Sequence, residues 1–269
     1  MNARRLALER RTLAVSGGLL VAFLALPLVA LFVTTTFVDF RSGLSHSLVW
    51  PALRLSLLTT SISLVLVVVL GTPLAWSLAS SSGRAARALE TLIQMPIVVP
   101  PAVAGVAMLL AFGRRGLLAG WLYPEGASLT FTTAAVVMAE VFVSAPFFVQ
   151  AATSAFRRID PKLLVVARTF GASPLRVFFR IAIPLAAPGL VAGAAMSWAR
   201  SLGEFGATLM FAGNLEGRTQ TLPLAIYTAL EADLRAAQAL SIVLVVVAFA
   251  LLLFVRAALR RSTNPEDAR

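Results

Sequence analysis

Long apolar stretches divide the chain into six segments, and their pattern predicts six helices. Five segments contain no charged residue, and the sixth, 126–156, contains only Glu140. A membrane-spanning helix needs roughly 20 consecutive apolar residues, and every segment is close to or above that length. We therefore predict an all-α protein with six transmembrane helices. The other five segments are 12–38, 55–83, 91–113, 181–199 and 236–255.

The first apolar segment follows a basic N-terminus and could be taken for a signal peptide. Its uncharged stretch is much longer than the roughly 7–15 residues of a signal-peptide core, so we interpret it as an uncleaved helix. The chain then divides into residues 1–54 (N-terminal segment, first helix and outer loop), a transmembrane domain over 55–256, and a cytoplasmic tail over 257–269.

The composition excludes several classes of protein. Hydrophobic residues make up 59% of the chain and charged residues 13%, which does not fit a soluble enzyme, a coiled coil or a disordered chain. The chain has no Cys and a single His, His46, so it offers neither a disulfide framework nor a thiolate or His-based metal cluster. It lacks a phosphate-binding G-x-x-x-x-G-K-[ST] string. We expect no enzymatic activity and no bound cofactor.

The basic residues behind the formal net charge of +11 are unevenly distributed along the chain. Sixteen of the 23 Lys and Arg residues fall on one side of the six segments, and six fall on the other. The positive-inside rule makes the richer side cytoplasmic, and an even number of spans places both termini there. The basic excess therefore orients the chain in the bilayer and requires no nucleic-acid partner.

The basic segment between the fourth and fifth helices carries the strongest local signals. Asp160 is a good N-cap and Pro161 follows at the first helical position. Gly171 stands where a left-handed residue ends a helix, and Ser173-Pro174 repeats the start signal. Two short helices should therefore meet around Gly171. They form either an amphipathic loop on the lipid surface or a docking element for a cytoplasmic partner.

The same segment resembles the signature loop of bacterial binding-protein-dependent ABC permeases. That pattern is Glu-Ala-Ala, three residues, Gly, nine residues, Ile, one residue and Leu-Pro. Here Ala167, Gly171 and Ile181 match it, Ile183-Pro184 replaces Leu-Pro, and Val165-Val166 replaces the leading Glu-Ala.

This resemblance implies that the helix ending at Gly171 is a coupling helix, which docks on a separate ATPase subunit that binds ATP and Mg²⁺. The coupling residues implied within 157–180 and just beyond it are Asp160, Pro161, Leu164, Ala167, Arg168, Gly171, Ser173, Pro174, Ile181 and Pro184.

Strings near the outer end of the fifth helix narrow the resemblance. GEFGATLMFAGN (203–214), GRTQTLPLAIY (217–227) and AFGRRGLLAG (111–120) look like the permeases of molybdate and tungstate importers, with sulfate permeases as close relatives. Arg200 and Glu204 are four residues apart and can pair on one helix face. They form either a structural pair or an outer gate on an anion path, whose candidate residues are Arg114, Arg115, Arg200, Glu204, Asn214 and Gln220.

The resemblance also implies an architecture and partners. It implies a type I ABC importer permease in the bacterial inner membrane, working as a homodimer on a cytoplasmic ATPase dimer. An external oxyanion-binding protein would deliver molybdate or tungstate to loops around 113–125 and 204–235. A sulfate or thiosulfate permease is the alternative substrate assignment.

Three polar or helix-breaking features inside the segments leave alternatives open. Glu140 either hydrogen-bonds a neighbouring helix, near Arg54 or a dimer seam, or relays protons in a secondary transporter. Prolines 96, 100 and 101 predict a kink that either opens the cytoplasmic half or only assists packing. The hydroxyls at 56, 59, 60, 61 and 63 fit helix packing better than substrate contact.

Overall fold

The computed structural model describes residues 3–122 and 128–263, and within these ranges the regular structure is helical, without strands. The chain forms two compact units, one of residues up to 46 with 226–243, the other of 47–225 with the remainder. Five helices are long and apolar enough to cross a membrane, and a bent helix pair can supply a sixth span. This agrees with the predicted all-α fold of six spans.

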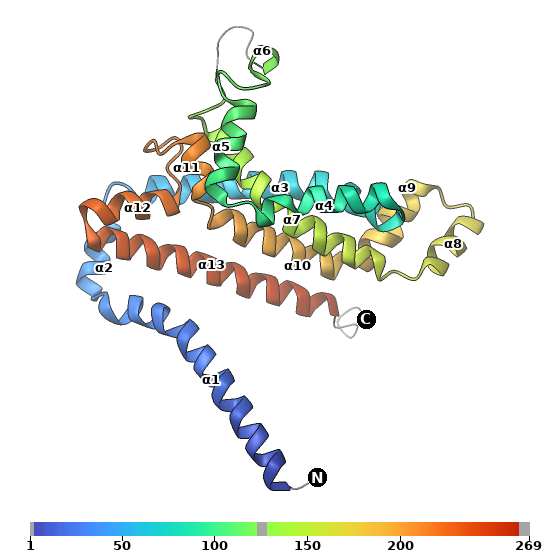
Figure 1. Ribbon diagram of the computed structural model, residues 1–269, viewed down its shortest axis with the longest axis horizontal. Helices are drawn as coiled ribbons and strands as arrows, with labels where there is room; N and C mark the ends of the chain where they lie inside the picture. Colours follow the sequence, from blue (N-terminus) through green and yellow to red (C-terminus); the bar gives the residue numbers. More distant parts are fainter. Residues whose placement is uncertain (1–2, 123–127, 264–269) are drawn as a thin grey trace. The chain divides into compact units, whose positions relative to one another are not determined.

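Three long helices form the centre of the larger unit: α3 (Val49–Ser80), α7 (Thr133–Arg157) and α10 (Ile183–Leu202). They run alongside one another (Figure 1). Buried side chains of α7, among them Phe148 and Phe156, pack against α3 and α10, and the ring of Trp76 meets that of Phe156 edge-on at 5.3 Å. Helix α7 therefore lies at the centre of this unit and packs against both other long helices.

The predicted third span is broken rather than continuous. Helices α4 (Arg84–Val98) and α5 (Pro101–Phe112) meet at 115°. Pro100 and Pro101 cause the break, because proline donates no backbone hydrogen bond and forces the preceding residue out of the helical region. The predicted kink is thus a sharp turn. Helix α4 begins at Arg84, before the predicted apolar segment 91–113.

The fifth span begins earlier than its apolar segment. Helix α9 (Pro174–Val177) passes through a π-helical turn, Phe178–Ala182, directly into α10, giving one continuous span of 29 residues. The predicted second short helix and the predicted span over 181–199 are thus one helix. The π-helical turn, in which the Ile183 amide bonds the Phe178 carbonyl, lets the chain pass Pro184, which has no N–H to donate.

Glycines allow α5 to approach α11 (Gly206–Ala212) closely. A Cβ atom added to Gly105 would lie 2.7 Å from the Cβ of Met210 and 2.8 Å from the carbonyl oxygen of Ala207. Ala104 and Met108 of α5 share a core cluster with Phe211 of α11 and with α7. The remaining short helices of this unit are α6 (Ala119–Leu122) and α8 (Pro161–Thr169).

The smaller unit holds α1 (Ala3–Thr34), α2 (Phe37–Leu44) and the adjoining parts of α12 (Leu222–Ala232) and α13 (Leu234–Thr263). Arg235 Nε lies 3.1 Å from Asp39 Oδ1, which ties α2 to α13. None of residues 14–34 is buried by this chain. An apolar stretch of this length is suited to a place in the lipid bilayer.

Candidate coupling and translocation sites

The segment predicted to couple to an ATPase is built as its sequence indicates. Asp160 Oδ1 accepts a hydrogen bond of 2.9 Å from the Lys162 amide at the start of α8. Gly171 adopts a φ of +79°, in the left-handed region. Ser173 then caps α9 by accepting a bond from the Arg176 amide. Both predicted caps and the predicted glycine turn are confirmed.

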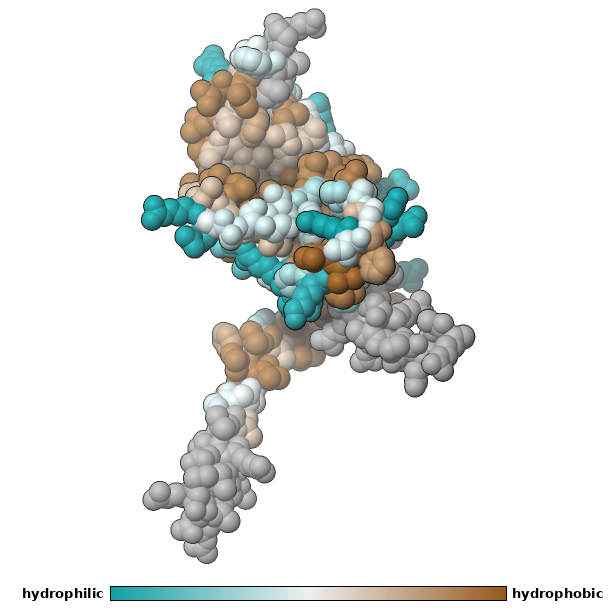
Figure 2. Space-filling view, turned by 90° about the vertical axis from the view of Figure 1, so that its right-hand side faces the viewer, coloured by the Kyte–Doolittle hydropathy of each residue, from teal (hydrophilic) through white to brown (hydrophobic). Residues whose placement is uncertain are grey.

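This segment exposes an apolar surface flanked by basic residues. No residue of α8 is buried, and Phe170 is 86% exposed. Figure 2 views the end of the molecule where α8 and α9 lie, and hydrophilic and hydrophobic side chains stand side by side there. Leu164 turns inward and packs against the α3–α7–α10 core. Val165, at the position of the motif Glu, is exposed.

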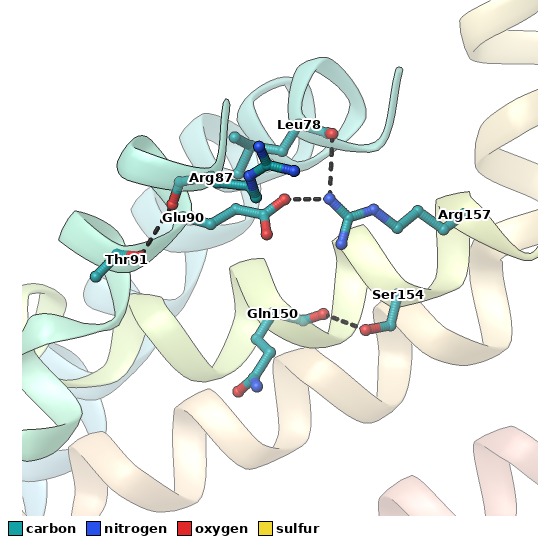
Figure 3. Close-up of polar contacts among 7 residues, drawn as sticks. All are labelled: Leu78, Arg87, Glu90, Thr91, Gln150, Ser154 and Arg157. Carbon is teal, nitrogen blue, oxygen red and sulfur yellow. Dashed lines mark hydrogen bonds and ion pairs between the residues drawn. The ribbon is translucent and has the colours of Figure 1, made fainter. Parts of the chain in front are cut away.

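An ion pair that was not predicted from the sequence lies at the start of this segment. Arg157, the last residue of α7, bonds Glu90 of α4, and its Nη2 also donates to the Leu78 carbonyl of α3 at 3.5 Å (Figure 3). The available signal was Glu90 itself, which is the only acidic residue between Asp39 and Glu125. Its isolation beside basic residues could have indicated a specific partner.

At the other end of α10, Arg200 and Glu204 form the expected pair. Arg200 Nη1 lies 2.7 Å from Glu204 Oε2. The second carboxylate oxygen accepts a bond of 2.7 Å from the Ala207 amide in the first turn of α11. Glu204 is buried while Arg200 is partly exposed. The carboxylate therefore fixes α11 to the end of α10.

Glu140 contacts a neighbouring helix, as one of the two alternatives predicted. Its Oε1 accepts a hydrogen bond of 2.7 Å from the Thr59 hydroxyl of α3. The expected proximity to Arg54 is not seen among the described contacts, and Arg54 is exposed. Glu140 thus joins α3 to α7.

The other hydroxyls of α3 also connect helices. Ser56 Oγ accepts from the Leu222 amide at 2.7 Å, and Thr60 Oγ1 accepts from Trp198 Nε1 at 3.0 Å. Ser63 is buried, whereas Ser61 is exposed. These bonds support the packing interpretation for the buried members of the set.

The remaining candidate path residues lie in two separate segments of the chain. Arg114 and Arg115 are exposed beyond the end of α5 and take part in no ion pair within the described residues. Asn214 and the buried Gln220 belong to a loop that Thr133 fastens to α7, through a bond of 2.9 Å from its hydroxyl to the Arg218 carbonyl. Part of the predicted docking loop, 123–125, and of the predicted tail, 264–269, lies outside the described residues.

Comparison with known proteins agrees with this geometry. The family described as "Binding-protein-dependent transport system inner membrane component" matches residues 69–264. A molybdenum transport system permease protein of Mycobacterium tuberculosis is 47% identical over 85% of this chain and 86% of its own. The corresponding protein of Escherichia coli K12 is 38% identical over 68% of this chain and 80% of its own.

Solved structures show the same fold at low sequence identity. A bacterial ABC transporter involved in the import of alginate superposes with a TM-score of 0.77 at 19% identity, covering 97% of this chain and 98% of the other. The MetNI methionine ABC transporter in an inward-facing conformation gives 0.65 at 18% identity, covering 81% and 97%.

The fold is that of a type I ABC importer permease. The family match defines the class: a multi-pass permease subunit, with ATP hydrolysed by a separate subunit. The chain belongs to the family of binding-protein-dependent transport system inner membrane components. Its place is the inner membrane, and its partners as an importer permease are an ATPase and a binding protein.

Proposed function

We propose that this chain is the permease through which an ATP-driven importer carries molybdate, or the similar tungstate, into the bacterial cytoplasm. The observation that supports this best is the 47% identity over 85% of the chain to a molybdenum transport permease. The strings at 203–214 and 217–227, which resemble those of oxyanion permeases, add to it. Sulfate or thiosulfate import is the less favoured alternative.

In this proposal two copies of the chain enclose the path, with both termini cytoplasmic. Two ATPase subunits dock on the exposed surface of 157–180, using Asp160 to Pro174 as the coupling element, with Ile181 and Pro184 anchoring it to the fifth span. ATP binds with Mg²⁺ on the ATPases, and no cofactor is held by this chain. The binding protein delivers the oxyanion to the outer loops.

The Arg200–Glu204 pair serves as the outer gate in this scheme. A tetrahedral dianion needs favourable charge along its path, but a fixed cluster of free Arg would hold it too tightly. An arginine already paired with a buried carboxylate attracts an anion weakly, which favours passage over retention. Exposed Arg114 and Arg115 would raise the local anion concentration, while Asn214 and Gln220 line the approach.

Reconstitution tests the proposal. The chain is placed in proteoliposomes with its ATPase and binding protein, and uptake of labelled molybdate is measured with and without ATP. We expect ATP-dependent uptake that tungstate inhibits strongly and sulfate weakly. Stronger inhibition by sulfate would transfer the assignment to the sulfate group. Uptake by the chain alone down a proton gradient would instead support a secondary transporter using Glu140.

A further inference from the structure

One guanidinium joins three helices at the start of the coupling segment. Arg157 is the last residue of α7 and lies three positions before Asp160, the cap of α8. It pairs with Glu90 of α4 and donates to the carbonyl of Leu78 in α3 (Figure 3). Because only three positions separate Arg157 from the start of α8, a displacement of α8 would also move this guanidinium.

Helix α4 has little else to hold it against α7. None of its fifteen residues is buried, although Ile93 packs against the core. A cavity of about 130 Å³ lies between the two helices, lined among others by Gln94, Gln150 and Thr153. Among the described ion pairs, Arg157–Glu90 is the one that involves α4. This pair is thus the main polar connection between α4 and the helix that leads into the coupling segment.

We infer that Arg157 is a positioning residue that makes α4 move with the coupling segment, through an ion pair with Glu90 that stays closed during transport. The inference rests on the proposed function, because it requires an ATPase that displaces 160–171. Motion of α4 passes through the bend at Pro100 to α5. Helix α5 packs on α11, which Glu204 fastens to the outer end of α10.

The exposure of the pair separates this role from a role in stability. The side chains of Arg157 and Glu90 are 47% and 23% exposed, and ion pairs of this kind contribute little to folding. Removing the pair should leave the fold intact and loosen the connection between α7 and α4. Arginine suits the task because its planar fork can hold two acceptors in fixed directions at once.

Charge reversal tests the inference in the complete complex of permease, ATPase and binding protein. The variants are Arg157→Glu, Glu90→Arg and the double variant, and the readout is ATP hydrolysed per molybdate taken up. Each single variant should raise this ratio about fivefold or more, the lower end of typical coupling between sites. The double variant should return to within about twofold of wild type, because the pair is restored with its charges exchanged.

Arg84→Glu is the matched control, because it makes the same charge change on α4, six positions before Glu90 and outside the docking surface 157–180. Arg84 is exposed and takes part in none of the ion pairs of the described residues, so its ratio should stay at the wild-type value. An unchanged ratio in the single variants, or no recovery in the double variant, overturns the inference. If the wild-type complex shows no ATP-dependent uptake, the proposed function fails instead.

A covalent link tests whether the connection stays closed. The chain has no natural cysteine, so Glu90→Cys/Arg157→Cys can be joined before assembly by a reducible thiol cross-linker that replaces the lost side chains. We expect uptake per ATP near the wild-type value while the link is intact and a lower value after reduction. Uptake that stops on linking and returns on reduction would show that the pair must open, and would overturn the inference.

Discussion

At the residue scale, two buried carboxylates each join two helices. Glu140 was identified from the sequence as the one charge inside its apolar segment, and Glu204 from the GEFG string to which it belongs. The Arg200 partner followed from the spacing of four. The Thr59 partner of Glu140 could not be predicted, because it lies on a helix distant in sequence. The bond that Glu204 accepts from α11 could not be predicted either, because it depends on how two helices separated by a turn are placed.

Glu140→Gln should preserve transport. The glutamine amide oxygen can accept the Thr59 hydroxyl bond in place of carboxylate Oε1, so the connection between α3 and α7 persists. We expect ATP-driven uptake within about twofold of wild type, because the glutamine keeps the hydrogen bond that joins the two helices. Loss of uptake together with loss of its pH dependence would contradict this and point to a proton relay.

Glu204→Ala should destabilise the outer end of α10 and α11. It removes the acceptor of the Ala207 amide and the partner of Arg200, and an unsatisfied buried group costs about 1–3 kcal/mol. Thermal unfolding in detergent should show a lower midpoint than wild type. Glu204→Gln is the control, because its amide oxygen keeps the bond to Ala207, and its midpoint should lie between the two. Equal midpoints for all three proteins would refute the capping role.

At the element scale, the short helices were easier to predict than the long ones. The caps of α8 and α9 each depend on two adjacent residues. Asp160-Pro161 and Ser173-Pro174 were therefore sufficient to predict where these helices begin. Hydrophobic length located the spans but could not place their ends. Two features depend on packing against α7: the π-helical turn that joins α9 to α10, and the angle of the bend at Pro100. Local sequence does not encode that packing.

Gly171→Pro should uncouple transport without preventing membrane insertion. Proline fixes φ near −65°, far from the +79° of Gly171, and removes the amide that donates to the Arg168 carbonyl at 3.0 Å. The turn between α8 and α9 would then be lost. We expect uptake near background and normal amounts of protein in the membrane. Gly171→Asn, which tolerates the left-handed region, should retain most uptake; normal uptake by the proline variant would disprove the coupling assignment.

Gly105→Val should separate α5 from α11. The added side chain would overlap Met210 and the Ala207 backbone, and overpacking typically costs about 1–3 kcal/mol. A lower unfolding midpoint in detergent is the expected result. Gly17→Ala in α1 is the control, since an added Cβ meets nothing within 4 Å there, and it should not lower the midpoint. Similar midpoints for both variants would contradict the close approach.

At the scale of the whole molecule, the charge distribution gives a testable orientation. The sixteen basic residues assigned to one side predict that the coupling segment and both termini face the cytoplasm. Because the natural chain lacks cysteine, single cysteines can report sidedness against a membrane-impermeant maleimide. Ser42→Cys in α2 should react in cells with a permeable outer membrane, and Ser173→Cys only after lysis. The reverse pattern would invert the topology.

From the sequence, the class of assembly could be predicted only through the resemblance to a known family. The coupling signature and the strings around 203–227 indicated the class of transporter, and the family match agrees. How the spans of this chain pack against one another was not predictable, since it depends on contacts between residues far apart in the sequence. Residues 14–34 show this, because their hydropathy predicts a span but not which helices it contacts.

The break between α4 and α5 limits where lipid can lie. Helix α5 has 12 residues, which is about 18 Å of helix, and it ends beside the charged Arg114 and Arg115. Its inner end at Pro100 therefore falls inside a hydrocarbon layer of roughly 30 Å. Non-helical backbone at that depth persists only against protein or water. The bend thus marks a part of the permease that protein or water covers and from which acyl chains are excluded.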